Sequence, residues 1–231
     1  MNIALITAGG VGERMHQQIP KQFINVYDKP IIIYTLEAFQ KHPDIDLIIV
    51  ACLEGWKEIM QAYARQFGIE KLKFIVSGGK NGQESIKNCL DVLAKECSED
   101  DIVLVHDGNR VMVSADIISD CIAKTKQFGS AIATVPCTEA ILKTEDKETS
   151  GISISRDSLM RTQTPHGFPL SKLLWAHEEA AKRGITNSIA SCTLMVELGE
   201  TVHLSAGSPK NFKITTMDDI EMFKAMLNAK W

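Results

Sequence analysis

The first twenty-one residues place an apolar run of strand length before a glycine-rich turn and two cationic side chains. The run Ile3–Thr7 leads into the turn Ala8–Gly12, and Arg14 and Lys21 follow. Glycines remove side chains from a turn, so that backbone N–H groups can surround an anion. The two cations add full positive charge where a phosphate would lie. We interpret this segment as a triphosphate-binding loop; a tight strand-to-helix turn without a ligand is the alternative.

Two better-known phosphate-binding loops do not fit this segment. A dinucleotide-binding turn has the pattern Gly-x-Gly-x-x-Gly with an acidic residue about twenty positions later, and here the third glycine is missing. A Walker-type loop needs Gly-x-x-x-x-Gly-Lys-Ser/Thr, which does not occur in the chain.

Composition limits the classes of protein to consider. The chain has 231 residues, of which 45% are hydrophobic and 23% charged, as in an ordinary globular protein of one large α/β domain. The formal net charge of −4 argues against a general nucleic-acid binder. No basic leader precedes the first strand and no apolar run reaches membrane-spanning length, so we expect a cytoplasmic protein without membrane segments.

The cysteines do not have the spacing of a metal site. None of the six forms a Cys-x-x-Cys pair, and most have apolar neighbours in the sequence. We therefore expect reduced, buried thiols and no structural zinc.

Apolar runs of strand length alternate with helical patterns along the chain. The expected strands include 45–52, 72–76, 101–105, 130–135 and 201–204. The expected helices are 31–42, 56–67, a helix that follows the turn 77–79 and runs through Ser85 and Leu93, 114–126, 171–182, 188–198 and a final helix that follows an N-cap at Thr216. This alternation predicts an α/β fold with a mostly parallel, Rossmann-like sheet that has helices on both faces.

The carboxyl ends of parallel strands form the ligand crevice of such a sheet. The loops after Thr7, Val76 and Val105 should open on the same edge. We therefore expect four side chains that are far apart in sequence to lie close together at this edge, namely Arg14, Lys21, Ser85 and Asp107.

The segment 137–163 has a different pattern. Residues 139–143 and 152–156 alternate apolar and polar side chains and are separated by the polar run 144–151. This pattern predicts a protruding β-hairpin arm on a single domain of residues 1–231. A lone hairpin is only marginally stable in water, so we expect the arm to pack on a partner chain in a homodimer. A solvated hairpin is the alternative.

The chain resembles the cytidylyltransferases that act on sugar-alcohol phosphates, namely the 2-C-methyl-D-erythritol 4-phosphate and D-ribitol-5-phosphate enzymes. The resemblance runs nearly from end to end. It rests on the segments Ala8–Met15, Pro20–Phe23, Gly78–Gly79 with Ser85, Val105–Asp107 with Arg110, Arg156, Gln163–Pro165 and Asn211–Thr215.

The resemblance implies transfer of CMP from CTP to a polyol phosphate. A phosphate oxygen of the acceptor attacks the α-phosphorus of CTP in line and pyrophosphate leaves, so catalysis needs positioning and charge stabilisation rather than a protein nucleophile. It implies catalytic roles for Arg14, Lys21 and Lys213. The nucleotide-binding residues would be Thr7, Ala8, Gly9, Gly10, Gly12, Gly79, Ser85 and Asp107, and the substrate-binding residues Asp107, Arg110, Arg156 and Thr164. Mg²⁺ would be held mainly by CTP phosphates, with Asp107 as the protein ligand.

The chain departs from the family pattern mainly on the acceptor side. Gly108 stands where the family usually has Ala or Ser, and Val111 stands where it usually has Pro. Gly82 stands where it usually has an arginine. Ala140 stands where an arm threonine is usual, and an aspartate near residues 186–192 is missing. This pattern favours an intact transferase whose acceptor differs from the best-known ones. The candidate acceptors are methylerythritol phosphate, ribitol phosphate and a related polyol phosphate.

Two other functions stay open from the sequence. A nucleotide-sugar-dependent glycosyltransferase generally has an Asp-x-Asp motif after a strand, and the residue two positions after Asp107 is Asn109. A non-catalytic nucleotide-binding protein is the third possibility. The cations at positions 14, 21 and 213 argue against it, whereas the changes on the acceptor side favour it.

Overall fold

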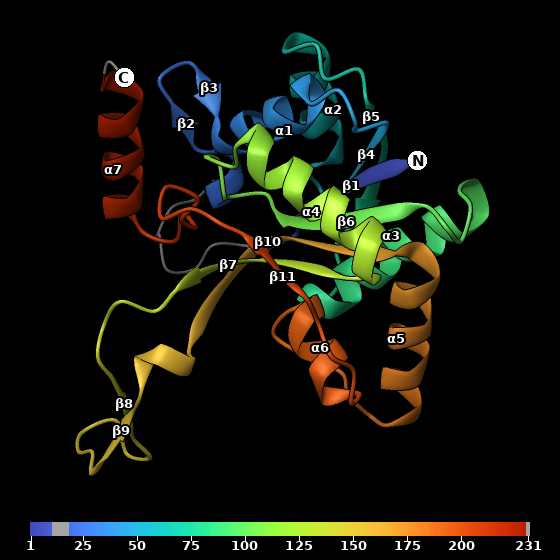
Figure 1. Ribbon diagram of the computed structural model, residues 1–231. Helices are drawn as coiled ribbons and strands as arrows, with labels where there is room; N and C mark the ends of the chain where they lie inside the picture. Colours follow the sequence, from blue (N-terminus) through green and yellow to red (C-terminus); the bar gives the residue numbers. More distant parts are fainter. Residues whose placement is uncertain (11–18, 230–231) are drawn as a thin grey trace.

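The computed structural model describes residues 1–10 and 19–229 (Figure 1). The strands are β1 (Asn2–Ala8), β2 (Asn25–Val26), β3 (Lys29–Pro30), β4 (Leu47–Cys52), β5 (Leu72–Ser77), β6 (Ile102–Asp107), β7 (Ala131–Pro136), β8 (Ile141–Lys143), β9 (Ile152–Ile154), β10 (Met160–Pro169) and β11 (Leu204–Ala206). The helices are α1 (Ile31–Lys41), α2 (Lys57–Gln66), α3 (Gly82–Glu96), α4 (Ala115–Phe128), α5 (Leu170–Lys182), α6 (Ser191–Glu197) and α7 (Met217–Asn228). Short 3-10 helices cover Lys21–Phe23 and Arg156–Ser158.

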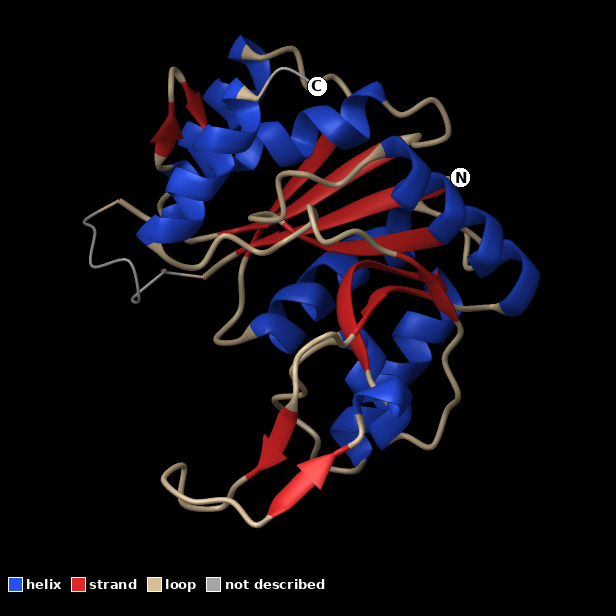
Figure 2. Ribbon diagram, turned by 60° about the vertical axis from the view of Figure 1, so that its left-hand side comes forward, coloured by secondary structure: helices blue, strands red, loops and turns tan. Residues whose placement is uncertain are grey.

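Within the described residues, seven strands form the central sheet in the order β11-β7-β10-β6-β1-β4-β5 (Figure 2). Every pair in this sheet is parallel except those of β10, which runs antiparallel to both β6 and β7. The predicted mostly parallel α/β sheet is confirmed. Its order places the ends of β1 and β6 side by side at the centre, where a parallel sheet offers its ligand crevice.

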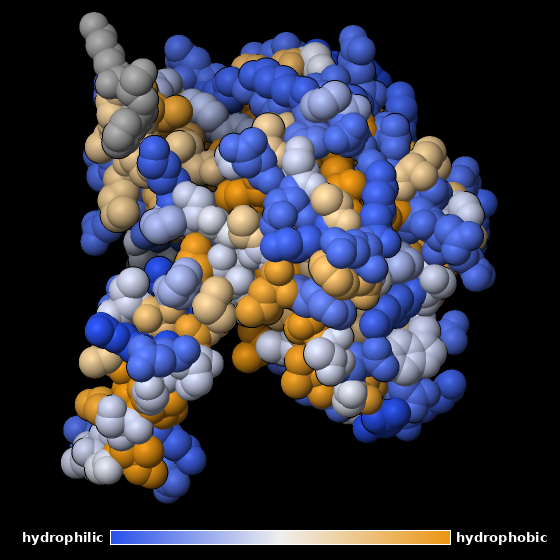
Figure 3. Space-filling view, viewed as in Figure 1, coloured by the Kyte–Doolittle hydropathy of each residue, from blue (hydrophilic) through white to orange (hydrophobic). Residues whose placement is uncertain are grey.

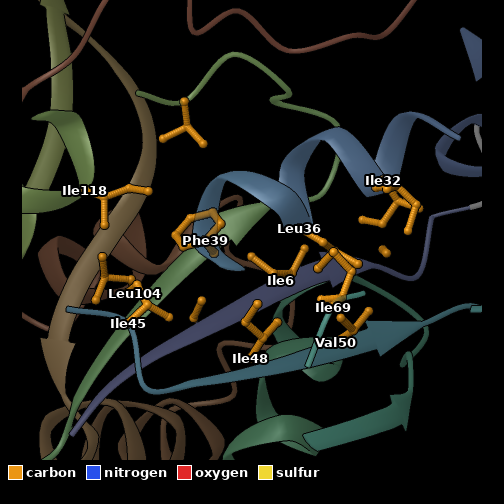
Figure 4. Close-up of a cluster of buried hydrophobic side chains, with 14 of the residues drawn as sticks. Ile6, Ile32, Leu36, Phe39, Ile45, Ile48, Val50, Ile69, Leu104 and Ile118 are labelled. Atoms are coloured by element: carbon orange, nitrogen blue, oxygen red, sulfur yellow. The ribbon is translucent and has the colours of Figure 1, made fainter. Parts of the chain in front are cut away.

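Helices cover both faces of the sheet because successive side chains of a strand point to opposite faces. In β1, Ala4 and Ile6 belong to the core under α1, α2 and α4, whereas Ile3 and Leu5 belong to the core under α3, α5 and α6. Figure 4 shows the first of these cores, with Leu36 of α1 close to Ile6. The two cores fix the central strands rigidly, and with them the loops at their carboxyl ends.

The helix starts follow local capping rules. The Ser114 side chain accepts from the Ile117 N–H group at the start of α4. At the start of α7, Thr216 and Asp219 form the reciprocal pair of hydrogen bonds known as a capping box. Both starts agree with the predicted N-caps.

Several elements differ from the predicted ones, and the short strands β2 and β3 have no counterpart among them. Strand β10 was not expected, since its polar sequence with two prolines lacks a strand pattern, and it becomes a strand because it lies between β6 and β7. Helix α6 begins at Ser191 rather than Ser188, because Ala190 is still extended. Strand β11 covers Leu204–Ala206 instead of 201–204, where it pairs with Ile132 to Thr134 of β7.

The arm projects from the body of the molecule beyond β7 and β10 (Figure 1). Its strands β8 and β9 pair antiparallel, with Ile141 opposite Ile154, as the predicted hairpin requires. Apolar and polar side chains lie side by side on its surface (Figure 3), and Leu142 is 63% and Ile152 55% exposed. No helix in the described part of the chain is long and apolar enough to cross a membrane.

Candidate active site

A cavity of about 530 Å³ opens at the carboxyl ends of β1, β5 and β6, in the size range of small-molecule sites. It brings together segments from the first ten residues to the stretch before α7. The predicted site residues that line it are Thr7, Ala8, Gly9, Gly10, Lys21, Gly79, Ser85, Asp107, Arg110, Thr164 and Lys213. The crevice expected from the strand order is therefore where the structure has its cavity.

Two predicted residues lie outside the described part of the chain, and a third lies elsewhere. Gly12 and Arg14 belong to the segment 11–18, which the structure does not describe. Arg156 lies at the base of the arm, where its guanidinium donates to the Thr138 carbonyl, and it does not line the cavity of its own chain.

Two glycine turns meet at the floor of the cavity. A Cβ atom on Gly78 would lie 3.0 Å from the Gly9 Cα atom and 3.3 Å from the Cys52 carbonyl oxygen. A side chain at position 78 would therefore push the two turns apart. The Ser85 hydroxyl accepts from the Gly79 N–H group at 2.9 Å and donates to the Asn81 carbonyl at 2.8 Å. Ser85 thus fixes the second turn through both of its bonds.

Gln22 holds the first glycine turn, a role that the sequence did not reveal. Its side-chain amide is buried and donates to the carbonyl oxygens of Ala8 at 2.7 Å and Gly10 at 3.1 Å. These bonds fix the turn next to Lys21. Lys80 also lines the cavity without having been predicted; its position just after the Gly78-Gly79 pair was the available signal.

Asp107 is held between two cations at the mouth of the cavity. Its carboxylate oxygens lie 3.0 Å from Lys213 Nζ and 3.0 Å from Arg110 Nε. Burial disfavours the charged carboxylate, but Lys213 and Arg110 outweigh it and hold the pKa of Asp107 well below its usual range. The carboxylate is therefore ionised throughout the neutral pH range, with a cation on each side.

Asn109 fixes the backbone that carries Lys213. The Asn109 side chain donates to the Ile214 carbonyl, and the Ile214 N–H group donates to the Asn109 carbonyl at 2.9 Å. Arg110 Nη1 donates to the Asn211 carbonyl at 2.8 Å. The segment before α7 is thus attached to the turn after β6, although about a hundred positions separate the two in the sequence. No sequence pattern indicates this role for Asn109.

Three histidines near the cavity are buried. Burial lowers the pKa of His106, His166 and His177 to about 4 in each case. Since the ordinary value is 6.5, the folded chain binds fewer protons than the unfolded chain between pH 4 and 6.5. These histidines stabilise the fold fully above pH 6.5, and their contribution falls as the pH drops through this window.

We expect unfolding near pH 5 to take up about three protons through these side chains, one for each histidine whose pKa is lowered. The measurement is the urea midpoint as a function of pH, with the m-value as a check on two-state unfolding. His177→Gln is the matched control and should reduce the uptake by about one proton. An unfolding midpoint that does not change between pH 7 and pH 5 would contradict the assignment.

The donor groups in the cavity allow a limited role for a metal ion. Among the cavity-lining residues that the structure describes, Asp107 alone carries a carboxylate. No group of three or more metal-ligating side chains occurs in residues 1–10 and 19–229. A single carboxylate suits Mg²⁺ that is bound mainly by substrate phosphates and water, since Mg²⁺ keeps several waters and needs few protein ligands.

Comparison with known proteins places these residues in a family. The family model described as "IspD: 2-C-methyl-D-erythritol 4-phosphate cytidylyltransferase" matches residues 2–229. A ribitol-5-phosphate cytidylyltransferase of Lacticaseibacillus paracasei is 45% identical, with 100% of this chain and 99% of the relative covered. A 2-C-methyl-D-erythritol 4-phosphate cytidylyltransferase of Clostridium botulinum is 35% identical, with 98% and 97% covered.

A solved structure agrees with these matches. The crystal structure of 2-C-methyl-D-erythritol 4-phosphate cytidylyltransferase from Francisella tularensis has a TM-score of 0.81 at 28% identity, with 97% of this chain and 99% of the other covered. The fold, the cavity at the glycine turns and the full-length matches agree, and this chain belongs to the 2-C-methyl-D-erythritol 4-phosphate cytidylyltransferase family.

Proposed function

We propose that this cytidylyltransferase transfers CMP from CTP to ribitol 5-phosphate and releases pyrophosphate. The observation that carries the transfer chemistry is the ion cluster of Lys213, Asp107 and Arg110 beside the two glycine turns. The choice of acceptor rests on identity, which is 45% to a relative named for ribitol 5-phosphate and 35% to one named for methylerythritol phosphate. Methylerythritol phosphate is the second candidate.

The reaction needs no protein nucleophile. A phosphate oxygen of the acceptor forms a bond to the α-phosphorus of CTP, the bond to the bridging oxygen of the β-phosphate breaks, and pyrophosphate leaves with that electron pair. Lys21, and Arg14 as an expectation from the sequence, would stabilise the charge on the triphosphate. Lys213 would stabilise the α-phosphate from the opposite side of the cavity. Cations that are in place before charge develops on the equatorial oxygens lower the barrier.

A bound Mg²⁺ would neutralise part of the charge of the triphosphate and of the leaving pyrophosphate. Asp107 is the side chain that would hold it, and its carboxylate would then be shared between the ion and its present partners Lys213 and Arg110. The same carboxylate could instead accept a hydrogen bond from an acceptor hydroxyl. A glycosyltransferase site would need a second carboxylate here, and Asn109 lines the cavity two positions later.

We further propose that the protein is a cytoplasmic homodimer in which each arm completes the site of the other subunit. Leu142 and Ile152 of the arm are more than half exposed, which suits a surface that a second subunit covers. Arg156 does not line the cavity of its own chain, and in a dimer it would reach the acceptor phosphate of the neighbouring site. A guanidinium suits this role because it can bind two phosphate oxygens at once.

CTP with Mg²⁺ should raise the midpoint of thermal unfolding, because only the folded state holds the cationic side chains together around a cavity that can bind the nucleotide. At a ligand concentration about a hundred times the Kd, the stabilisation should be about 2.7 kcal/mol. ATP and GTP should raise the midpoint less, since the resemblance to the cytidylyltransferases implies a base pocket sized for a pyrimidine. Differential scanning fluorimetry measures the effect. Equal shifts with all four nucleotides would contradict selective CTP binding.

Pyrophosphate release with CTP and a panel of polyol phosphates tests the choice of acceptor. We expect kcat/KM for ribitol 5-phosphate to exceed that for methylerythritol phosphate by about 10-fold or more, since one small group already gives about 10-fold discrimination and these acceptors differ in chain length, a methyl branch and a hydroxyl. A preference for methylerythritol phosphate would reverse the assignment of the acceptor. Absence of pyrophosphate with every acceptor would contradict cytidylyl transfer itself.

A further inference from the structure

His106 lies next to the ion cluster of Lys213, Asp107 and Arg110. It is the penultimate residue of β6 and is fully buried. Its ring packs edge-on against Phe39 of α1, with the ring centroids 5.0 Å apart. Both ring nitrogens nevertheless have hydrogen-bond partners, and both partners belong to the active site.

The hydrogen bonds define which nitrogen carries the proton. Nε2 lies 3.1 Å from the Arg110 carbonyl oxygen, which can only accept, so Nε2 is the donor. In the neutral ring Nδ1 is then an acceptor, and it lies 3.0 Å from the Thr164 hydroxyl, which donates to it. The same hydroxyl accepts from the Asp107 N–H group at 3.0 Å. The result is a continuous chain from the Asp107 backbone through Thr164 and His106 to the Arg110 backbone.

This chain closes the turn that carries the two charged groups. The Arg110 N–H group donates to the Asp107 carbonyl at 3.0 Å, and the Arg110 carbonyl accepts from His106. The backbone of Arg110 is therefore held at both ends, and the backbone of Asp107 is held through Thr164. Because Lys213 is ion-paired with Asp107, a shift of this turn moves the lysine as well.

We propose that His106, as the neutral Nε2–H tautomer, is a positioning residue that fixes Asp107, Arg110 and Lys213 in their catalytic arrangement through its bonds to Thr164 and the Arg110 carbonyl. The inference rests on the proposed cytidylyl transfer. It also assigns Thr164 a role through His106, because the hydrogen of its hydroxyl is already donated to Nδ1.

Replacing the ring tests the chain of hydrogen bonds. His106→Phe keeps a ring and removes both polar bonds, and should lower kcat about 100-fold, as expected when reacting groups are displaced by about 1 Å. His106→Asn places an amide near the Nδ1 position and His106→Gln places one near Nε2, so each should recover about 10-fold of the lost kcat. If neither amide exceeds the phenylalanine variant, the positioning role is wrong.

Phe39→Leu is the matched control, since Phe39 touches the same ring and makes none of these bonds. It should lower the free energy of unfolding and leave kcat near the wild-type value. A loss of kcat in Phe39→Leu equal to that in His106→Phe would show that packing alone matters, and would overturn the proposal.

Thr164→Val separates the proposed role of Thr164 from direct binding of the acceptor. We expect Thr164→Val to lower kcat and to leave the KM for the polyol phosphate unchanged. Combining it with His106→Phe should lower kcat no further, because both substitutions break the same chain of hydrogen bonds. A raised KM with unchanged kcat, or additive losses, would overturn the inference.

Nitrogen NMR of the wild-type protein gives a readout that needs no turnover. It should find His106 protonated on Nε2 and unprotonated on Nδ1, and the opposite tautomer would overturn the proposal. Wild-type pyrophosphate release in the same series tests the function itself, so a failure of the function and a failure of the positioning role give different results.

Discussion

Lys213→Ala should lower kcat by about 100-fold or more, the cost of losing one preorganised charge that stabilises the transition state. Its ammonium group lines the cavity and lies 3.0 Å from Asp107, so its removal takes away a cation and leaves the carboxylate less compensated beside the triphosphate. Steady-state pyrophosphate release at saturating CTP and acceptor measures the change.

The fold should survive this substitution, because the Lys213 side chain is 40% exposed and the segment is held by backbone bonds of Ile214. Lys224→Ala is a matched control, since Lys224 has a similar exposure of 37% and a 3.0 Å ion pair with Glu221 on α7. Circular dichroism should be unchanged in both variants. Near-normal turnover in Lys213→Ala would remove Lys213 from the catalytic residues.

Arg156→Ala should be nearly inactive although Arg156 lies outside the cavity of its own chain. The physical reason is the proposed shared site, in which the guanidinium reaches across to the acceptor phosphate of the partner. The loss should be about 100-fold in kcat/KM for the acceptor, with little effect on the KM for CTP. Lys143→Ala on the same arm is the control and should retain activity.

Mixing the two inactive variants tests the shared site directly. When Arg156→Ala and Lys213→Ala chains exchange subunits at equal amounts, half of the dimers are heterodimers. Each heterodimer combines an intact Lys213 on one chain with an intact Arg156 on the other and rebuilds one of its two sites. Activity should therefore recover to about a quarter of wild type per total site.

Subunit exchange has to be measured alongside, for example by mass spectrometry of differently tagged chains. Proven exchange without recovery would contradict a site made from two chains. A protein that is monomeric and fully active at assay concentration would contradict the dimer as well.

The sequence by itself determined the class of fold and the edge of the sheet at which the cavity opens. The apolar runs Ile3–Thr7 and Leu47–Cys52 are buried strands, because a strand inside a sheet with helices on both faces buries the side chains of both its faces. The alternation of strands and helices fixed the parallel order, and the parallel order put the loops after β1, β5 and β6 on one edge. Capping residues such as Ser114 and Thr216 marked helix starts correctly, since capping depends on neighbours within the same turn.

The sequence failed where the environment outweighs the local pattern. Strand β10 contains Pro165, Gly167 and Pro169 and has no period of two, and it is a strand because β6 and β7 lie on either side of it. Helix α6 starts three residues later than its pattern predicts, because the chain stays extended through Ala190.

Only the tertiary structure decided how the charged groups of the site are paired. Lys213 meets Asp107 because Asn109 attaches the segment before α7 to the turn after β6, and His106 meets Thr164 because β10 lies beside β6. These partners are 58 to 106 positions apart in the sequence. Spacing along a chain fixes geometry only within a helix, a strand or a turn. Contacts between distant segments depend on strand order and register, which the whole core sets together.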